Sequence, residues 1–351
     1  MRSAGLFDLQ VNGFAGIDFN SEAIDADGLD HALEAMLATG VTSCLPTIIT
    51  ASQDVLMARF AALDRAVAKS RLGPVMVPGY HLEGPFLSRA EGYAGCHPAS
   101  AMTAPDEALV RRLAGGLARP ILLVTVAPEL PSGEAFIQAM AAAGRVVAIG
   151  HSAADSAILA RAAEAGARLS THLGNGLPQI LHKVDNTLFA QLAEDRLHAS
   201  FIADGIHLPP PALKVMLRAK GFDRSILVSD AVSAAATEPG LYPFADMVVE
   251  HGEDGSVRVP GGRSLAGSAL TLDRAVRNLV GWGIAAPEDA LRMASDNPRQ
   301  LMAPALKAFG TEAGAGVVAW SSDLRTEDVR VSGLRWPTGG YEAVEPASSQ
   351  P

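Results

Sequence analysis

Four ionisable side chains stand where predicted β-strands end. Glu83 and Asp230 each close an apolar segment, and His151 and His172 directly follow two others. Carboxylate oxygen and imidazole nitrogen are ligands of zinc, and a catalytic zinc site keeps one position open for water. We therefore expect one divalent metal ion bound by Glu83, His151 and His172, with Asp230 beside it.

Each of these residues also has a simpler reading. A single histidine at a strand end is more often structural than a ligand, but the three expected ligands share the same place relative to a strand, which favours a common site. Asp230 could cap the segment that follows it. Facing the metal, it would instead act as general base on the attacking water and then as general acid towards a leaving amine.

Two amides, Gln10 and Asn12, follow the first predicted strand. Their i, i+2 spacing directs both side chains to one side. A pair of metal-binding histidines could occupy this position, but amides are poor zinc ligands. The pair thus indicates a vestigial second metal position and one metal rather than two. Otherwise the amides would hydrogen-bond a loop or the floor of the fold.

Polar residues on the predicted loops are candidates for binding a polar substrate. They are His97, Asn175, Lys183 and His207. Each alone is typical of a solvated loop. His207 is the strongest candidate, because Asp204-Gly205-Ile206-His207 comes directly after a strand.

Strand-like and helix-like segments alternate along the chain. The predicted strands are 6–13, 41–47, 74–78 leading to Glu83, 121–126, 148–151, 169–172, 199–203 and 226–230, and helical spacing occurs at 25–39, 52–68, 133–143, 153–165 and 210–220. This order predicts an α/β fold, a (β/α)8 TIM-type barrel, with an open doubly wound sheet as the alternative. A barrel gathers the carboxyl ends of its strands at one face, which would bring the four residues together.

The barrel is expected to span residues 1–303, with a β excursion at 241–260 on its rim. Residues 304–337 are expected to form a small, incomplete C-terminal β patch, and 338–351 a disordered tail. The polar loop 87–105 has a length typical of functional loops.

Composition narrows the class of protein. The 351 residues include 28 Lys+Arg against 38 Asp+Glu, a formal net charge of -10, without a basic cluster. This argues against nucleic acid or an anionic membrane as partner. The two cysteines lack C-x-x-C spacing, and neither a signal peptide nor an apolar run of about 18 residues is present. A cytoplasmic protein is predicted.

The motifs resemble the N-acetylglucosamine-6-phosphate deacetylase family of the amidohydrolase superfamily. They are His-Leu-Glu-Gly-Pro, Gly-His-Ser, Thr-His-Leu-Gly-Asn-Gly, Ile-Ala-Asp-Gly-Ile-His, Val-Ser-Asp-Ala and Leu-Ala-Gly-Ser-Ala-Leu-Thr, between Phe7 and about Met302. The resemblance implies a metal-dependent barrel that hydrolyses a linear amide C–N bond, releasing acetate from an amino-sugar phosphate. It also implies a homodimer.

The resemblance assigns roles by position. It implies that Glu83, His151 and His172 bind the metal, which would be zinc or else Fe²⁺, Co²⁺ or Mn²⁺. Asp230 would activate water and protonate the amine, and His207 would contact the sugar and polarise the carbonyl. His97 would contact the sugar, and the backbone amides of Asn175 and Gly176 the phosphate. Gln10 and Asn12 match the single-metal branch of the family.

Two departures from the family pattern bear on function. The family carries a longer segment before its first strand, so the β patch at 304–337 is expected to be at most half of the usual small domain. Where the family has an arginine for the phosphate, often from the neighbouring subunit, Lys183 aligns, and lysine does not reproduce a bidentate fork. The phosphate requirement thus stays open. The alternatives are another N-acyl sugar, an N-acyl amino acid or a cyclic amide, or a sugar-binding protein without turnover.

Overall fold

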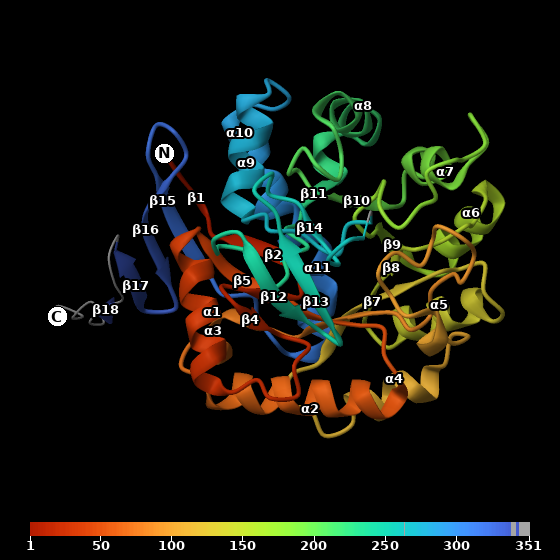
Figure 1. Ribbon diagram of the computed structural model, residues 1–351, viewed down its shortest axis with the longest axis horizontal. Coiled ribbons are helices and arrows are strands. Elements are labelled where there is room, and N and C mark those ends of the chain that lie inside the picture. Colours follow the sequence, from red (N-terminus) through yellow and green to blue (C-terminus); the bar gives the residue numbers. More distant parts are fainter. Residues whose placement is uncertain (263, 338–341, 344–351) are drawn as a thin grey trace.

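The computed structural model describes residues 1–262, 264–337 and 342–343 (Figure 1). Eight parallel strands form the central sheet, in the order β11-β10-β9-β8-β7-β6-β5-β2. Their bounds are β2 Leu6–Val11, β5 Val41–Ile49, β6 Tyr80–Glu83, β7 Ile121–Val126, β8 Val146–Ile149, β9 Ala167–Ser170, β10 His198–Phe201 and β11 Ser225–Leu227. Every residue of β2, β5 and β7 is buried, as expected for parallel strands with both faces covered.

The first and last strands of this sheet meet at their carboxyl ends. Val11 forms a parallel bridge with Ala231, and the Asp230 N–H donates to the Gln10 carbonyl at 2.9 Å. The sheet thus closes on itself, and the predicted barrel is confirmed over the open sheet.

Helices surround the barrel (Figure 1). They are α1 Ala26–Ala38, α2 Gln53–Lys69, α3 Gly73–Met76, α4 Glu107–Ala114, α5 Gly133–Ala142, α6 Ser156–Ala165, α7 Thr187–Ala193, α8 Pro210–Lys220, α9 Leu272–Gly281, α10 Pro287–Ala294 and α11 Asp296–Phe309, with 3-10 turns η1 Ala99–Ala101 and η2 Phe222–Arg224. Asp25 caps α1 by accepting from the Gly28 N–H, which explains where that helix begins. None of the described helices has the length and apolar character needed to cross a membrane.

The prediction of a strand at 74–78 is wrong. The chain instead forms α3, Gly73–Met76, and the strand that carries Glu83 is the shorter β6. Pro74 lies in the first turn of α3, where its missing N–H costs no hydrogen bond. An apolar run without periodicity does not separate a buried turn of helix from a strand.

A three-stranded lobe covers part of the barrel's carboxyl face. It consists of β12 Gly240–Phe244, β13 Met247–His251 and β14 Val257–Arg258, within the predicted β excursion, and a small hairpin pairs β3 Gly13–Phe14 with β4 Ile17–Asp18. Phe244, Val249 and Val257 form a second apolar cluster with Ile49 and Val232 of the barrel. This packing fixes the lobe above the strand ends.

A separate five-stranded sheet lies at one side of the barrel (Figure 1). It contains β1 Arg2–Ala4, β15 Gly316–Trp320, β16 Thr326–Val331, β17 Leu334–Pro337 and β18 Glu342–Ala343. β1 was not predicted, because its three residues carry no alternating pattern, yet it pairs antiparallel with β15. Apart from Glu342–Ala343, the predicted disordered tail lies outside the described residues.

Candidate metal centre and active site

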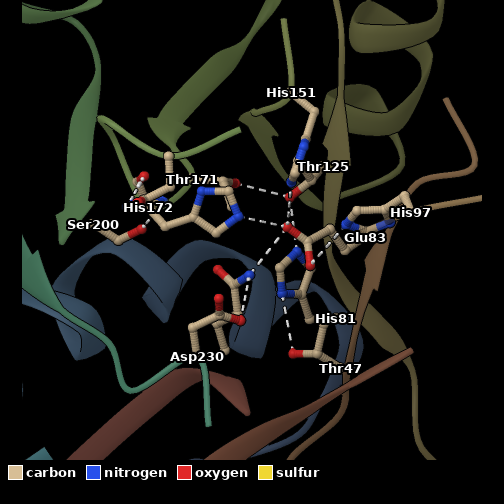
Figure 2. A network of polar contacts seen from close by, with 12 residues as sticks. Thr47, His81, Glu83, His97, Thr125, His151, Thr171, His172, Ser200 and Asp230 are labelled. Atoms are coloured by element: carbon tan, nitrogen blue, oxygen red, sulfur yellow. Dashed lines mark hydrogen bonds and ion pairs between the residues drawn. The ribbon is translucent and has the colours of Figure 1, made fainter. Parts of the chain in front are cut away.

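Glu83 is the hub of a buried polar network at the carboxyl end of the barrel (Figure 2). Its Oε1 accepts from Gln10 Nε2 at 3.1 Å and lies 2.9 Å from His172 Nε2 and 3.5 Å from His151 Nε2. His97 Nε2 is 3.9 Å from Glu83 Oε2. The barrel thus brings together the three predicted metal ligands, Glu83 at the end of β6, His151 after β8 and His172 after β9, and adds His97 from the loop after β6.

The charges of the network follow from burial and hydrogen bonding. Burial alone would raise the pKa of Glu83, but the neighbouring His151 and His172 outweigh it and hold that pKa well below its usual range. Burial lowers the pKa of His97 to about 3, and the neighbouring His151 adds to this effect. Glu83 is therefore ionised and His97 neutral near pH 7.

His151 and its neighbours fit a metal ion. His151 Nδ1 lies 2.7 Å from the Tyr93 carbonyl, which can only accept, so Nδ1 carries the proton. The buried Nε2 then presents a lone pair and has no hydrogen-bond partner. Ligand atoms of Glu83, His97 and His151 all lie within 4.8 Å of one another. An anchored imidazole opposite a carboxylate is the usual environment of a metal-binding histidine.

His172 reaches the same hub through a nitrogen that is protonated here. Its Nε2 donates to the ionised Glu83 carboxylate. Burial alone would lower the pKa of His172, but this hydrogen bond outweighs it and raises the pKa. Ligation through Nε2 therefore requires loss of that proton, which makes metal affinity depend on pH.

Beneath the hub, a second layer of polar side chains fills the barrel. His81 Nε2 lies 2.8 Å from Thr125 Oγ1, which lies 2.9 Å from Thr171 Oγ1, and His81 Nδ1 lies 3.3 Å from Thr47 Oγ1 (Figure 2). Burial lowers the pKa of His81 to about 4. This neutral layer supports the hub without adding charge next to Glu83.

Asp230 lies beside the hub and is held by the two amides. Its Oδ1 accepts from Asn12 Nδ2 at 2.9 Å and from Gln10 Nε2 at 3.2 Å. Since Gln10 Nε2 also donates to Glu83, one amide bridges both carboxylates. Burial raises the pKa of Asp230 to about 6; His172 opposes this rise and Glu83 adds to it. The amides predicted as a vestigial metal position act here as donors to acids.

The backbone is left-handed at three of these positions. His151, His172 and Asp230 have φ values of 50°, 29° and 50°. Residues other than glycine rarely adopt this region, which costs of order 1 kcal/mol or more at each position. The strand-end turns thus hold these side chains at the site in an unfavourable conformation, and the sequence carries no signal for it.

His207 is held by a carboxylate that sequence analysis gave no role. Asp204 Oδ2 lies 2.6 Å from His207 Nδ1, and Asp204 Oδ1 accepts the N–H groups of Ile206 and His207, each at 2.8 Å. Burial alone would raise the pKa of Asp204, but the bond with His207 outweighs it and lowers the pKa. The ionised Asp204 fixes the Nδ1–H form of the imidazole, so Nε2 is the nitrogen left for substrate.

Replacing Asp204 by asparagine is expected to lower kcat roughly 10- to 100-fold, with a smaller change in KM and an altered pH profile. The asparagine amide can also donate to Nδ1, so it no longer fixes the Nδ1–H form of His207. Steady-state kinetics over a pH series measure this effect. The exposed Asp195→Asn, on a surface ion pair with Arg224, is the matched control. An unchanged pH profile in folded Asp204→Asn would contradict the role.

A cavity of about 800 Å³ opens above the hub. Four residues predicted to bind substrate line it, namely His97, Asn175, Gly176 and His207. Lys183 is exposed and is not among the lining residues. The lobe contributes Arg258, which sequence analysis did not single out.

A closed parallel barrel, with a buried Glu–His cluster and an adjacent aspartate at its carboxyl face, has the architecture of metal-dependent hydrolases. No protein-family model matches the chain. The N-acetylglucosamine-6-phosphate deacetylase of Bos taurus is 36% identical over 313 residues, which cover 85% of this chain and 73% of the relative. The N-acetylgalactosamine-6-phosphate deacetylase of Shewanella is 33% identical over 303 residues, with 85% and 73% covered.

Solved structures agree with these relatives. The N-acetylglucosamine-6-phosphate deacetylase of Pasteurella multocida superposes with a TM-score of 0.83 at 28% identity, covering 96% of this chain and 86% of that one. The chain belongs to the N-acetylglucosamine-6-phosphate deacetylase family, and the predicted family is confirmed.

Proposed function

We propose that this chain hydrolyses the N-acetyl group of N-acetylglucosamine 6-phosphate to give acetate and glucosamine 6-phosphate. The observation that carries the proposal is the buried cluster of Glu83 with its histidines, next to Asp230, at the base of a cavity lined by His207. The family relatives supply the substrate class.

Glu83, His151 and His172 would hold one divalent ion, and His97 is close enough to join them. When bound, such an ion polarises the amide carbonyl and lowers the pKa of water. Zinc suits a carboxylate and imidazole set, with Fe²⁺, Co²⁺ and Mn²⁺ as alternatives.

Asp230 would move the proton. Asn12 and Gln10 occupy Oδ1, so Oδ2 takes the proton of the attacking water as its oxygen adds to the carbonyl carbon. The same oxygen then gives that proton to the amine nitrogen as the C–N bond breaks. A carboxyl whose pKa is raised to about 6 is suited to both steps. His207, oriented by Asp204, would donate from Nε2, when protonated, to the carbonyl oxygen as negative charge develops there.

The epimer N-acetylgalactosamine 6-phosphate is a second candidate substrate, because the Shewanella relative is named for it. Acetate release from both phosphorylated sugars and from unphosphorylated N-acetylglucosamine tests the proposal, on protein assayed for metal. We expect higher kcat/KM for a phosphorylated sugar than for the unphosphorylated one. Equal rates with and without phosphate, or no release from any of them, would overturn the proposal. The homodimer also remains a prediction, which light scattering tests.

A further inference from the structure

The charge around the cavity is unbalanced. Its base carries the carboxylates Glu83 and Asp230, whereas the proposed substrate ends in a phosphate that needs positive charge or N–H donors. Of the predicted phosphate contacts, Asn175 and Gly176 line the cavity, but the predicted cationic anchor, Lys183, is exposed and does not line it. Among the described residues that do, Arg258 has the only lysine or arginine side chain.

The position of Arg258 is fixed by the fold. Arg258 lies on β14, opposite Glu250 of β13, and forms an antiparallel bridge with Leu265. Its neighbour Val257 is buried in the apolar cluster that joins the lobe to the barrel. The backbone that carries the guanidinium is therefore held by sheet pairing on one side and by core packing on the other.

The same wall of the cavity reaches down to Asp230. The segment after Leu265 continues to Ser268, whose N–H donates to the Asp230 carbonyl at 2.9 Å. Arg258 and Asp230 thus stand on neighbouring stretches of one wall, the first on the lobe and the second at the barrel's strand ends.

Substrate chemistry requires this separation. On a pyranose ring, the nitrogen on C2 and the substituent on C5 lie at opposite ends of the ring. If the acetamide is placed at Asp230 and Glu83, the 6-phosphate points away from the base of the cavity. We propose that Arg258 of the lobe recognises this phosphate from within the same chain. A guanidinium offers the planar pair of donors that a phosphate accepts. The inference rests on the proposed function and names its specificity residue.

Kinetics with and without phosphate test this role. For Arg258→Gln we expect kcat/KM to fall roughly 10- to 100-fold on N-acetylglucosamine 6-phosphate, mainly through KM, and to stay near wild type on N-acetylglucosamine. Arg258→Lys should fall in between, because it keeps the charge but not the fork. The exposed Arg218→Gln is the matched control and should keep the preference for phosphate.

A binding measurement separates this inference from the proposed function. Calorimetry with glucosamine 6-phosphate requires no turnover, and Arg258→Gln should bind it more weakly by a similar factor. No acetate release by the wild type would overturn the proposed function, while calorimetry would still decide on Arg258. An unchanged phosphate preference in Arg258→Gln, an equal loss on both sugars, or equal glucosamine 6-phosphate binding would overturn the inference.

Discussion

Asp230→Asn is expected to lower kcat by about 10³-fold while the protein keeps its fold and its bound metal. Asparagine has nearly the same shape, and its carbonyl oxygen can still accept from Asn12 and Gln10 as Asp230 Oδ1 does. An amide, however, cannot take the proton from water or return it to the leaving amine. The loss should therefore appear in kcat, with substrate affinity retained.

Three measurements on one preparation check this result: acetate release, metal content and thermal unfolding. Buried carboxylates such as Asp230 usually cost stability when their pKa is raised, so the variant should unfold at the same temperature as the wild type or higher. Turnover within tenfold of the wild type at equal metal content would exclude Asp230 as the proton carrier.

Glu83→Gln is expected to abolish activity by a different route, through loss of the metal. Glu83 is a buried anion within reach of three histidines. A neutral amide removes the charge that attracts a cation, and its NH2 group would face the Gln10 amide or the protonated His172 Nε2, which are themselves donors. Mutating a residue that only hydrogen-bonds a metal ligand typically weakens metal affinity by roughly 10- to 100-fold. Because Glu83 is itself a predicted ligand, Glu83→Gln should weaken metal affinity by more than this.

Metal content after dialysis against a chelator measures this directly. The exposed Glu164→Gln on α6 is the matched control and should retain the metal of the wild type. Asp230→Asn should also retain its metal. Metal content therefore distinguishes the two inactive variants, because only Glu83→Gln should lose the ion. Full metal occupancy in Glu83→Gln would remove Glu83 from the ligand set.

The part of the site on strand ends could be predicted from the sequence. Parallel strands bring their carboxyl ends to one face, so an acid or histidine after each of several apolar runs is enough to place Glu83, His151, His172 and Asp230 together. The family and the barrel, predicted on those motifs, are confirmed.

The parts that depend on long-range packing could not be predicted. His97 reaches Glu83 because the loop after β6 folds back, with His97 Nδ1 at 2.9 Å from Thr50 Oγ1. Arg258 lines the cavity because Phe244 and Val249 pack the lobe onto Ile49 and Val232. In both cases the contact joins residues far apart in the chain, and no local pattern encodes it.

The left-handed turns at His151, His172 and Asp230 have a consequence for engineering. Glycine adopts this backbone without steric cost, so a library selected for thermal resistance alone would favour glycine at Asp230, whose buried carboxylate also costs stability, whereas glycine at His172 would leave the buried Glu83 carboxylate without its donor. Such a selection would raise thermal stability at the cost of catalytic activity. Engineering for thermal stability should therefore keep these three residues unchanged and introduce stabilising substitutions elsewhere, for example in the five-stranded sheet beside the barrel.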